Sequence, residues 1–179
     1  MTISGTNLTL VIGGAASGKS AYAEALSLGF SPRIYIATAE NRDDEMAAKI
    51  AAHQSTRGAE WQTLEAPLDL AAAIENAAPD ALLLVDCLTM WLANQMAADR
   101  DIHASTQRLI SALMARKGPT ICVTNELGAG LVPMERLSRQ FRNHQGRLNQ
   151  AIAAVSDRVV LVVAGLPLIL KGDLPGASQ

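Results

Sequence analysis

The chain has 179 residues, 49% of them hydrophobic and only 3% aromatic, so its core must be built from Ala, Leu, Val and Ile. Its formal net charge of −2 argues against a general nucleic-acid binder, which normally carries a basic excess. The length fits one compact domain, and we expect a single domain over residues 1–179, with an ordered core over about residues 8–171 and short flexible ends.

The sequence suggests neither secretion nor a membrane span. Met1–Asn7 has no basic region followed by an apolar stretch. The longest apolar run, Val159–Leu170, is interrupted by a glycine and a proline and is shorter than the ~20 residues that cross a bilayer. Cys87 and Cys122 lie in or beside strand-like runs and are expected to be buried free thiols. We therefore expect a cytoplasmic protein without a membrane span.

Short apolar runs alternate with helical patterns along the chain. Strands are expected over Leu8–Ile12, Arg33–Ala37, Ala81–Val85, Thr120–Thr124 and Arg158–Ala164. Helices are expected over Ser20–Leu28, Asp43–His53, Leu68–Ala77, Thr89–Ala98, Ala104–Arg116 and Glu135–Ser156. Most of the strand runs are nearly continuous in apolar character, which is typical of strands buried on both faces. The alternation predicts an α/β fold in which helices flank a mostly parallel sheet.

The last of these helices has the clearest pattern. One apolar stripe is formed by Leu137, Phe141, His144, Leu148 and Ile152. Because His144 lies on this stripe, we expect it to be a core or interface side chain rather than a catalytic one.

Residues 13–20 read Gly-Gly-Ala-Ala-Ser-Gly-Lys-Ser and match the phosphate-binding pattern G-x-x-x-x-G-K-[ST]. Glycines let backbone N–H groups approach phosphate oxygens, and the helix that follows directs its positive end at the anion. Lys19 can reach the β- and γ-phosphates, and Ser20 can ligate Mg²⁺. A strand precedes the loop and a helix follows it, as this site requires. We therefore predict a P-loop fold of the RecA-like kind, in which a nucleoside triphosphate contacts Gly13, Gly14, Ala15, Ala16, Ser17, Gly18, Lys19 and Ser20.

A second feature fits the same chemistry. The apolar strand Ala81–Val85 is followed by Asp86, like the strand that positions Mg²⁺ in P-loop enzymes. We predict that Asp86 and Ser20 lie on the metal side of the site. The simpler alternative is that Asp86 only caps the turn that follows the strand.

The loop alone leaves the kind of protein open. A regulatory GTPase would usually carry Asn-Lys-x-Asp, and this chain has Thr124-Asn125-Glu126-Leu127 instead. A small-molecule kinase would need cations for its second substrate, and four candidates lie near one another in Arg136, Arg139, Arg142 and Arg147. A solvated helix face explains at least half of these as well. A nucleotide-gated interaction module is a third, non-catalytic alternative.

Several longer segments resemble one family. The loop is similar to the family's GGARSGKS, and Tyr35–Ala39 is similar to its second strand. Asp43–Ile50 is followed in the family's order and spacing by His53, Arg57, Trp61, Thr63 and Glu65. Thr124–Gly128 leads to Gly130, Val132, Pro133, Arg139, Phe141, Arg142, Gly146, Asn149 and Gln150. Over about Leu8–Lys171 the chain thus resembles the bifunctional adenosylcobinamide kinase/adenosylcobinamide-phosphate guanylyltransferases of cobalamin biosynthesis.

Two departures from the family pattern stand out. Ala16 replaces the usual Arg and removes a positive charge from the loop, while the backbone cradle and Lys19 remain. Asn143-His144 replaces a commoner acidic-and-apolar pair before Gly146.

The resemblance implies two reactions. ATP or GTP phosphorylates adenosylcobinamide, and GMP from GTP is then transferred to adenosylcobinamide phosphate through a covalent histidine, which here is His53. Taken alone, His53 lies at the border of two helix faces and would more often be structural; a neutral imidazole is nevertheless a suitable nucleophile near pH 7. The resemblance further implies nucleotide contacts from Ala37, Thr38, Ala39, Gln54, Ser55, Thr56, Arg57, Glu65 and Asp86. It gives Glu126 and Arg142 a role on the corrinoid or kinase side, and it implies a homo-oligomer, with a trimer as the expected state.

Overall fold

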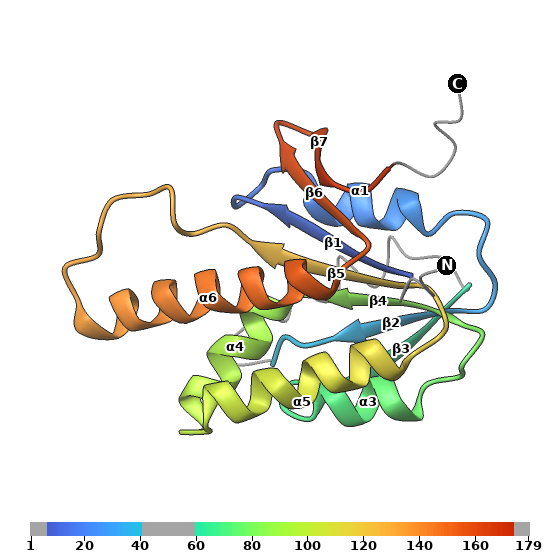
Figure 1. Cartoon of the computed structure of the whole chain (residues 1–179), viewed down its shortest axis with the longest axis horizontal. Helices are drawn as coiled ribbons and strands as arrows, with labels where there is room; N and C mark the ends of the chain where they lie inside the picture. The colour runs from blue at the N-terminus through green and yellow to red at the C-terminus, as the bar shows by residue number, and fades with distance from the viewer. Residues whose placement is uncertain (1–6, 41–59, 174–179) are drawn as a thin grey trace.

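The computed structural model describes residues 7–40 and 60–173 (Figure 1). Its strands are β1 (Leu8–Gly13), β2 (Arg33–Ala37), β3 (Trp61–Glu65), β4 (Leu82–Asp86), β5 (Thr120–Asn125), β6 (Arg158–Val163) and β7 (Leu166–Lys171). Its helices are α1 (Lys19–Leu26), α3 (Leu70–Asn76), α4 (Leu88–Ala97), α5 (Ile102–Ala115) and α6 (Arg136–Val155). The helix expected over Asp43–His53 lies outside the described residues.

All seven strands form one sheet in the order β3-β2-β4-β5-β1-β6-β7. The first six are mutually parallel, and only β7 runs antiparallel to its neighbour β6. Helix α1 covers one face, while α3, α4, α5 and α6 cover the other (Figure 1). The predicted α/β fold with a mostly parallel, helix-flanked sheet is therefore confirmed. Parallel pairing also brings the carboxyl ends of β1 to β6 to the same edge.

The core lies on both faces of the sheet, as the continuous apolar runs predict. Along β4, Leu83 packs with the α3–α6 layer, and its neighbour Leu84 packs on the α1 side. Both side chains are fully buried. Successive side chains of a strand point to opposite faces, so a strand with a helix layer on each side must be apolar at every position.

Two strands were not predicted. Strand β3 is an edge strand whose sequence, Trp-Gln-Thr-Leu-Glu, alternates in polarity and is half exposed. Strand β7 contains Pro167, which argues against a strand, and every one of its residues is exposed. The predicted strand Arg158–Ala164 ends at Val163, because Ala164 and Gly165 adopt positive φ angles of 53° and 77° and turn the chain back into β7.

The predicted stripe on helix α6 faces the core in the second half of the helix but not at its start. Leu148 and Ile152 of the stripe are buried, together with the polar Gln145 and Asn149, and Phe141 is partly buried against the core. Leu137, by contrast, is 66% exposed. The first half of α6 extends beyond the sheet together with the loop before it, and we call residues 127–144 the arm (Figure 1). The stripe thus continues past the core onto a surface. No helix in the described parts of the chain is long and apolar enough to cross a bilayer.

Candidate nucleotide site

The loop between β1 and α1 is built around two glycines that tolerate no side chain. A Cβ on Gly13 would overlap Ser17 Oγ and lie 2.8 Å from the carbonyl oxygen of Val162. Gly18 has a φ of 89°, and a Cβ there would lie 3.1 Å from the Cα of Gly165. A side chain at either position would move the backbone of the loop. The close approach expected of a phosphate-binding loop is therefore present in its geometry.

Backbone hydrogen bonds fasten this loop on both sides. The Glu126 N–H donates to the carbonyl oxygen of Gly13 at 3.0 Å, which ties the loop to the end of β5. The Gly165 N–H donates to the carbonyl oxygen of Ser17 at 2.8 Å, which ties it to the β6–β7 turn. Lys19 Nζ donates to the carbonyl oxygen of Gly14 at 3.1 Å, so its ammonium group lies over the loop. Together the loop and Lys19 form a fixed, positively charged cradle.

Asp86 ends β4, two strand positions from the loop. Strand β5 lies between β4 and β1, so the ends of β4 and β1 are about 10 Å apart. Within residues 7–40 and 60–173 the Asp86 carboxylate has no hydrogen-bond or ion-pair partner. A half-buried carboxylate that no other described residue pairs, at the same edge of the sheet as the cradle, suits a bound cation.

The donors fit Mg²⁺, which prefers oxygen ligands and is usually held by one or two protein groups together with substrate phosphates. Ser20 supplies a hydroxyl in the first turn of α1, and Asp86 supplies a carboxylate. Among the described residues no group of three His, Cys, Asp or Glu side chains could hold a metal ion. Ser20 and Asp86 would therefore hold the ion only together with the nucleotide.

The two cysteines are not suited to nucleophilic chemistry at neutral pH. Burial raises the pKa of the Cys87 thiol to about 11, and the neighbouring Asp86 carboxylate acts in the same direction. Lys19 opposes this weakly, which places its charge near the end of β4. Burial alone raises the pKa of Cys122 to about 12. Both thiols stay protonated, and both cysteines are free, as predicted.

Two buried polar atoms beside the cradle have no hydrogen-bond partner in the described part of the chain, namely Ser17 Oγ and Asn125 Oδ1. Asn125 pairs with Gly13 in the parallel register of β5 and β1. Buried polar atoms are normally paired, so two unpaired ones at this position indicate that a ligand completes the site. Asn125 was not predicted as a site residue, although its place at a strand end beside β1 was a usable signal.

A buried polar network holds the end of β5. Gln145 Nε2 donates to Thr124 Oγ1 and to Asn149 Oδ1, each at 2.8 Å. Thr124 Oγ1 donates to Asn149 Oδ1 at 2.8 Å, and Asn149 Nδ2 donates to the Asn125 carbonyl oxygen at 3.0 Å. These polar residues of α6 therefore fix the backbone that carries Asn125 and the hydrogen bond to Gly13.

The residues predicted at the end of β2 are only partly available to a ligand. Thr38 is buried, and its hydroxyl donates to the Cys87 carbonyl oxygen at 2.7 Å and accepts from the Cys87 N–H at 2.9 Å. Its side chain thus joins β2 to β4. Ala37 and Ala39 are half-buried at the same edge of the sheet. Any contact from this segment is therefore made by backbone or by these two methyl groups.

The structure does not bring all the predicted residues together. Glu65 is exposed at the end of the edge strand β3. Strands β2, β4 and β5 separate it from β1, which puts it about 19 Å from the cradle. Glu65 could therefore meet only a part of a ligand that lies far from the phosphates. His53, Gln54, Ser55, Thr56 and Arg57 lie outside the described residues.

Comparison with known proteins decides the family. The family model described as cobinamide kinase/cobinamide phosphate guanyltransferase matches residues 9–170. The chain belongs to this family. It is 45% identical over 168 residues to the bifunctional adenosylcobalamin biosynthesis protein CobP of Pseudomonas aeruginosa, covering 92% of this chain and 97% of that one. It is 41% identical over 181 residues to the bifunctional adenosylcobalamin biosynthesis protein CobU of Salmonella typhimurium, covering 92% and 99%.

The resemblance seen in the sequence is thus confirmed, and this cobinamide kinase/guanyltransferase family member is a kinase and nucleotidyltransferase of cobalamin biosynthesis. The alternatives of a kinase without guanylyl transfer and of a non-catalytic module are not favoured. A solved structure described as an ATPase of the type III secretion system of pathogenic bacteria is similar in fold, with a TM-score of 0.54 and 13% identity over 92% of this chain and 57% of that one. That similarity confirms the P-loop fold and says nothing further about function.

Proposed function

We propose that the chain, as a single nucleotide-binding domain, phosphorylates the aminopropanol hydroxyl of adenosylcobinamide with ATP or GTP. It then transfers GMP from GTP to the resulting phosphate through His53, giving adenosylcobinamide-GDP and pyrophosphate. The observation that carries this proposal is the cradle at Gly13–Ser20, where neither Gly13 nor Gly18 can accept a Cβ. A glycine-rich loop of this kind, followed directly by a helix N-terminus, is a ready-made binding site for phosphate.

In the kinase step, the loop N–H groups and Lys19 hold the β- and γ-phosphates, and the positive end of α1 faces them. Ser20 and Asp86 would hold Mg²⁺ together with the phosphates, and the ion would supply positive charge that offsets the charge on the phosphate oxygens. The substrate hydroxyl attacks the γ-phosphorus, the bond to the bridging oxygen breaks, and the hydroxyl proton is released. Positioning and charge stabilisation are the protein's main contributions to phosphoryl transfer.

In the guanylyl step, a neutral imidazole nitrogen of His53 attacks the α-phosphorus of GTP and pyrophosphate leaves. A phosphate oxygen of adenosylcobinamide phosphate then attacks the His53-bound phosphorus and frees the histidine. The cradle would hold the outgoing pyrophosphate. Both thiols in the chain are protonated at neutral pH, which leaves histidine as the better nucleophile.

Labelling with GTP tests the covalent step without any corrinoid. Protein incubated with [α-³²P]GTP and Mg²⁺ should retain an acid-labile, base-stable label, as a phosphoramidate does, and [γ-³²P]GTP should leave none. His53→Ala should abolish the label. Unlabelled wild-type protein, or equal labelling of His53→Ala, would contradict the mechanism. A kinase without guanylyl transfer would instead show γ-phosphoryl transfer and no adduct.

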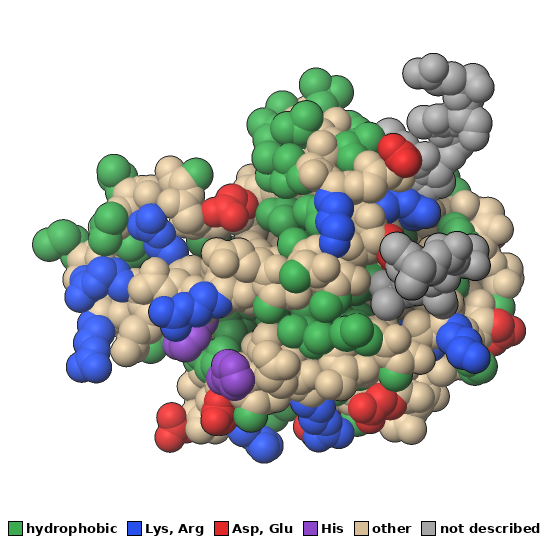
Figure 2. Space-filling view, in the orientation of Figure 1, with side chains coloured by type: hydrophobic (Ala, Val, Ile, Leu, Met, Phe, Trp, Pro, Cys, Tyr) green, Lys and Arg blue, Asp and Glu red, His purple; other side chains and the backbone are tan. Residues whose placement is uncertain are grey.

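The remaining proposals concern assembly and location. We propose a cytoplasmic homo-oligomer, with three copies as the expected number. Large apolar side chains gather on the β6–β7 hairpin, where Val163, Leu166, Leu168 and Leu170 are each more than half exposed (Figure 2). An apolar patch on an edge strand normally marks an interface. Light scattering should therefore give a multiple of the chain mass, and Leu168→Asp should lower it; a monomeric wild type would refute the proposal.

A further inference from the structure

An apolar groove of about 550 Å³ lies between α4, the loop after β5 and the first half of α6. Its walls include Met96 from α4, Leu127 and Leu131 from the loop, and Leu137 and Phe141 from α6. Its size and its apolar lining are those of a small-molecule site rather than of a packing defect. None of the nucleotide contacts described above uses it.

The groove begins beside the cradle. Leu127 follows Glu126, whose N–H donates to the carbonyl oxygen of Gly13, the first residue of the cradle. The Glu126 carboxylate accepts from the Gly128 N–H and so shapes the turn that carries Leu127 into the groove wall. A molecule seated in the groove is therefore next to the place where the γ-phosphate of a bound nucleotide would lie.

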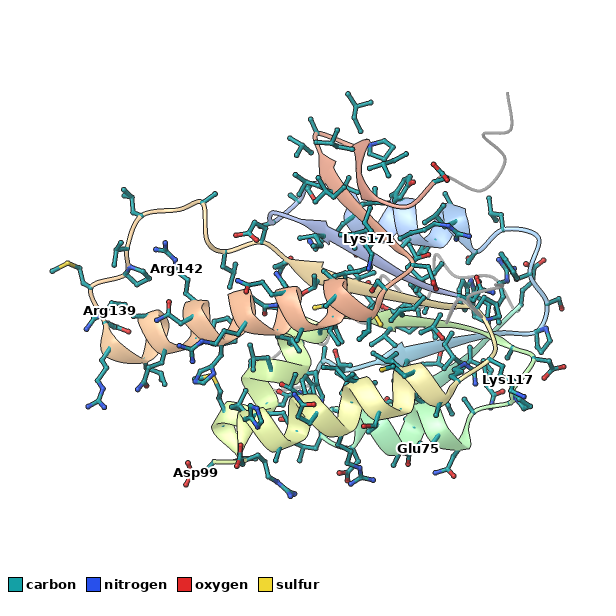
Figure 3. The ribbon with its side chains drawn as sticks, viewed as in Figure 1. Glu75, Asp99, Lys117, Arg139, Arg142 and Lys171 are labelled. Carbon is teal, nitrogen blue, oxygen red and sulfur yellow. The ribbon has the colours of Figure 1, made fainter. Side chains whose placement is uncertain are left out.

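The loop that forms the outer wall of the groove is held in place by hydrogen bonds from arginine side chains, not by buried apolar packing. Arg142 donates to the carbonyl oxygens of Leu131 at 3.2 Å and of Gly128 at 2.9 Å. Arg139 donates to the carbonyl oxygens of Pro133 and Met134. Figure 3 shows Arg142 between α6 and the loop and Arg139 nearer the tip of the arm. The rim is thus positively charged, and Arg142 uses only two of its five N–H donors in these bonds.

We propose that this groove is the corrinoid subsite, a proposal that rests on the proposed function. The corrin macrocycle is a broad, largely apolar body fringed with amides, and its face matches the apolar walls. The phosphate that the kinase step adds is an anion, and the guanidinium of Arg142 on the groove rim complements its charge. The groove is open to solvent, so it seats one face of the macrocycle and leaves the other exposed.

The exposed apolar wall provides a test in the full-length protein. Leu131 is 96% and Leu137 66% exposed, so Leu131→Asp and Leu137→Asp should leave the fold intact. Leu28→Asp is the matched control, because Leu28 is 69% exposed on the far side of the sheet, after α1. Binding of adenosylcobinamide is measured by equilibrium dialysis without nucleotide, the adduct by [α-³²P]GTP labelling without corrinoid, and the assembly by light scattering.

The groove variants should raise the Kd for adenosylcobinamide roughly tenfold or more, since each places a charge where an apolar face would be buried. Their GMP labelling and mass should match those of the wild type and of Leu28→Asp. An unchanged Kd would overturn the subsite, and so would a fall in mass that accompanies the loss of affinity, because a second copy would then occupy the groove. A wild type that binds adenosylcobinamide but takes no label would refute the guanylyl step and leave the groove standing.

Discussion

The two sides of the site are built in different ways. The cradle, residues 13–20, is fastened by backbone hydrogen bonds to β5 and to the β6–β7 turn, and its glycines lie against other backbone. The arm, residues 127–144, is fastened chiefly by two arginine side chains to loop carbonyls, and four of its apolar side chains are exposed, namely Leu131, Val132, Met134 and Leu137. Backbone contacts leave little freedom, whereas a loop held by long side chains can adjust.

This difference matches what each side would bind. Phosphate is small, and its recognition by N–H groups demands fixed geometry. A corrinoid is large and irregular, and it is better met by an adjustable apolar surface on a rigid scaffold. Substitutions in the cradle should therefore affect chemistry or folding strongly, and those in the arm should affect substrate affinity alone.

The largest effect is expected from Lys19→Met, which removes the only side-chain cation on the cradle. Loss of a fixed charge aimed at a developing phosphate charge costs roughly 10²–10³-fold in rate. The kcat/KM for phosphorylation of adenosylcobinamide should fall by this order. Lys117→Met is the control, because Lys117 is exposed and lies after α5. Wild-type kinase activity in Lys19→Met would mean that the cradle is not the phosphate site.

Gly13→Ala should destabilise the fold, and Gly14→Ala should not. The added methyl at Gly13 would overlap Ser17 Oγ and press on the Val162 carbonyl, whereas a Cβ at Gly14 has nothing within 4 Å. Overpacking of this kind costs about 1–3 kcal/mol. Urea unfolding of the two variants would measure the difference. Equal stabilities would show that the cradle is less tightly packed than its geometry indicates.

The cradle was predictable because it is local. Eight consecutive residues carry its pattern, and the strand before it and the helix after it are visible in the same stretch of sequence. Asp86 was predictable for a similar reason, since an apolar run ends next to a carboxylate. The expected role of His53 comes from the resemblance and remains a prediction, because that residue lies outside the described residues.

The features that the sequence did not predict depend on contacts between segments far apart in the chain. Gly165 lies against Gly18 and bonds to Ser17, yet 147 positions separate the two glycines in the chain. The polar residues Gln145 and Asn149 are buried only because β5 ends in Thr124 and Asn125 beneath them. The stripe on α6 predicted a helix correctly, but periodicity could not show that its first half would leave the sheet and line a groove.

Arg142→Gln should have a smaller effect than Gly13→Ala, and it should change the affinity for adenosylcobinamide instead of the stability of the fold. It removes the bonds to the Leu131 and Gly128 carbonyls and loosens the arm without touching the core. Exposed hydrogen bonds to a charged group contribute about 1 kcal/mol, so the KM for adenosylcobinamide should rise roughly threefold to tenfold. The free energy of unfolding and the KM for GTP should stay near their wild-type values. A large loss of stability would place Arg142 in the fold instead of the arm.

The smallest effect is expected at Ala16, an exposed cradle residue that stands where the family usually has an arginine. Ala16→Arg returns a cation to the loop, and at an exposed position such a charge contributes at most about 1 kcal/mol, or a twofold to fivefold lower KM for GTP. Ala16 has a φ of 54°, which strains alanine and arginine alike, so the stability of the fold should not change. Ala16→Gln supplies similar length without charge and should leave KM unaltered. Because added salt screens an exposed charge, the gain in affinity for GTP should shrink as ionic strength rises. A gain that persists in high salt, or that Ala16→Gln reproduces, would contradict this. It would mean that the side chain acts by contact and that the cradle does not depend on charge at this position.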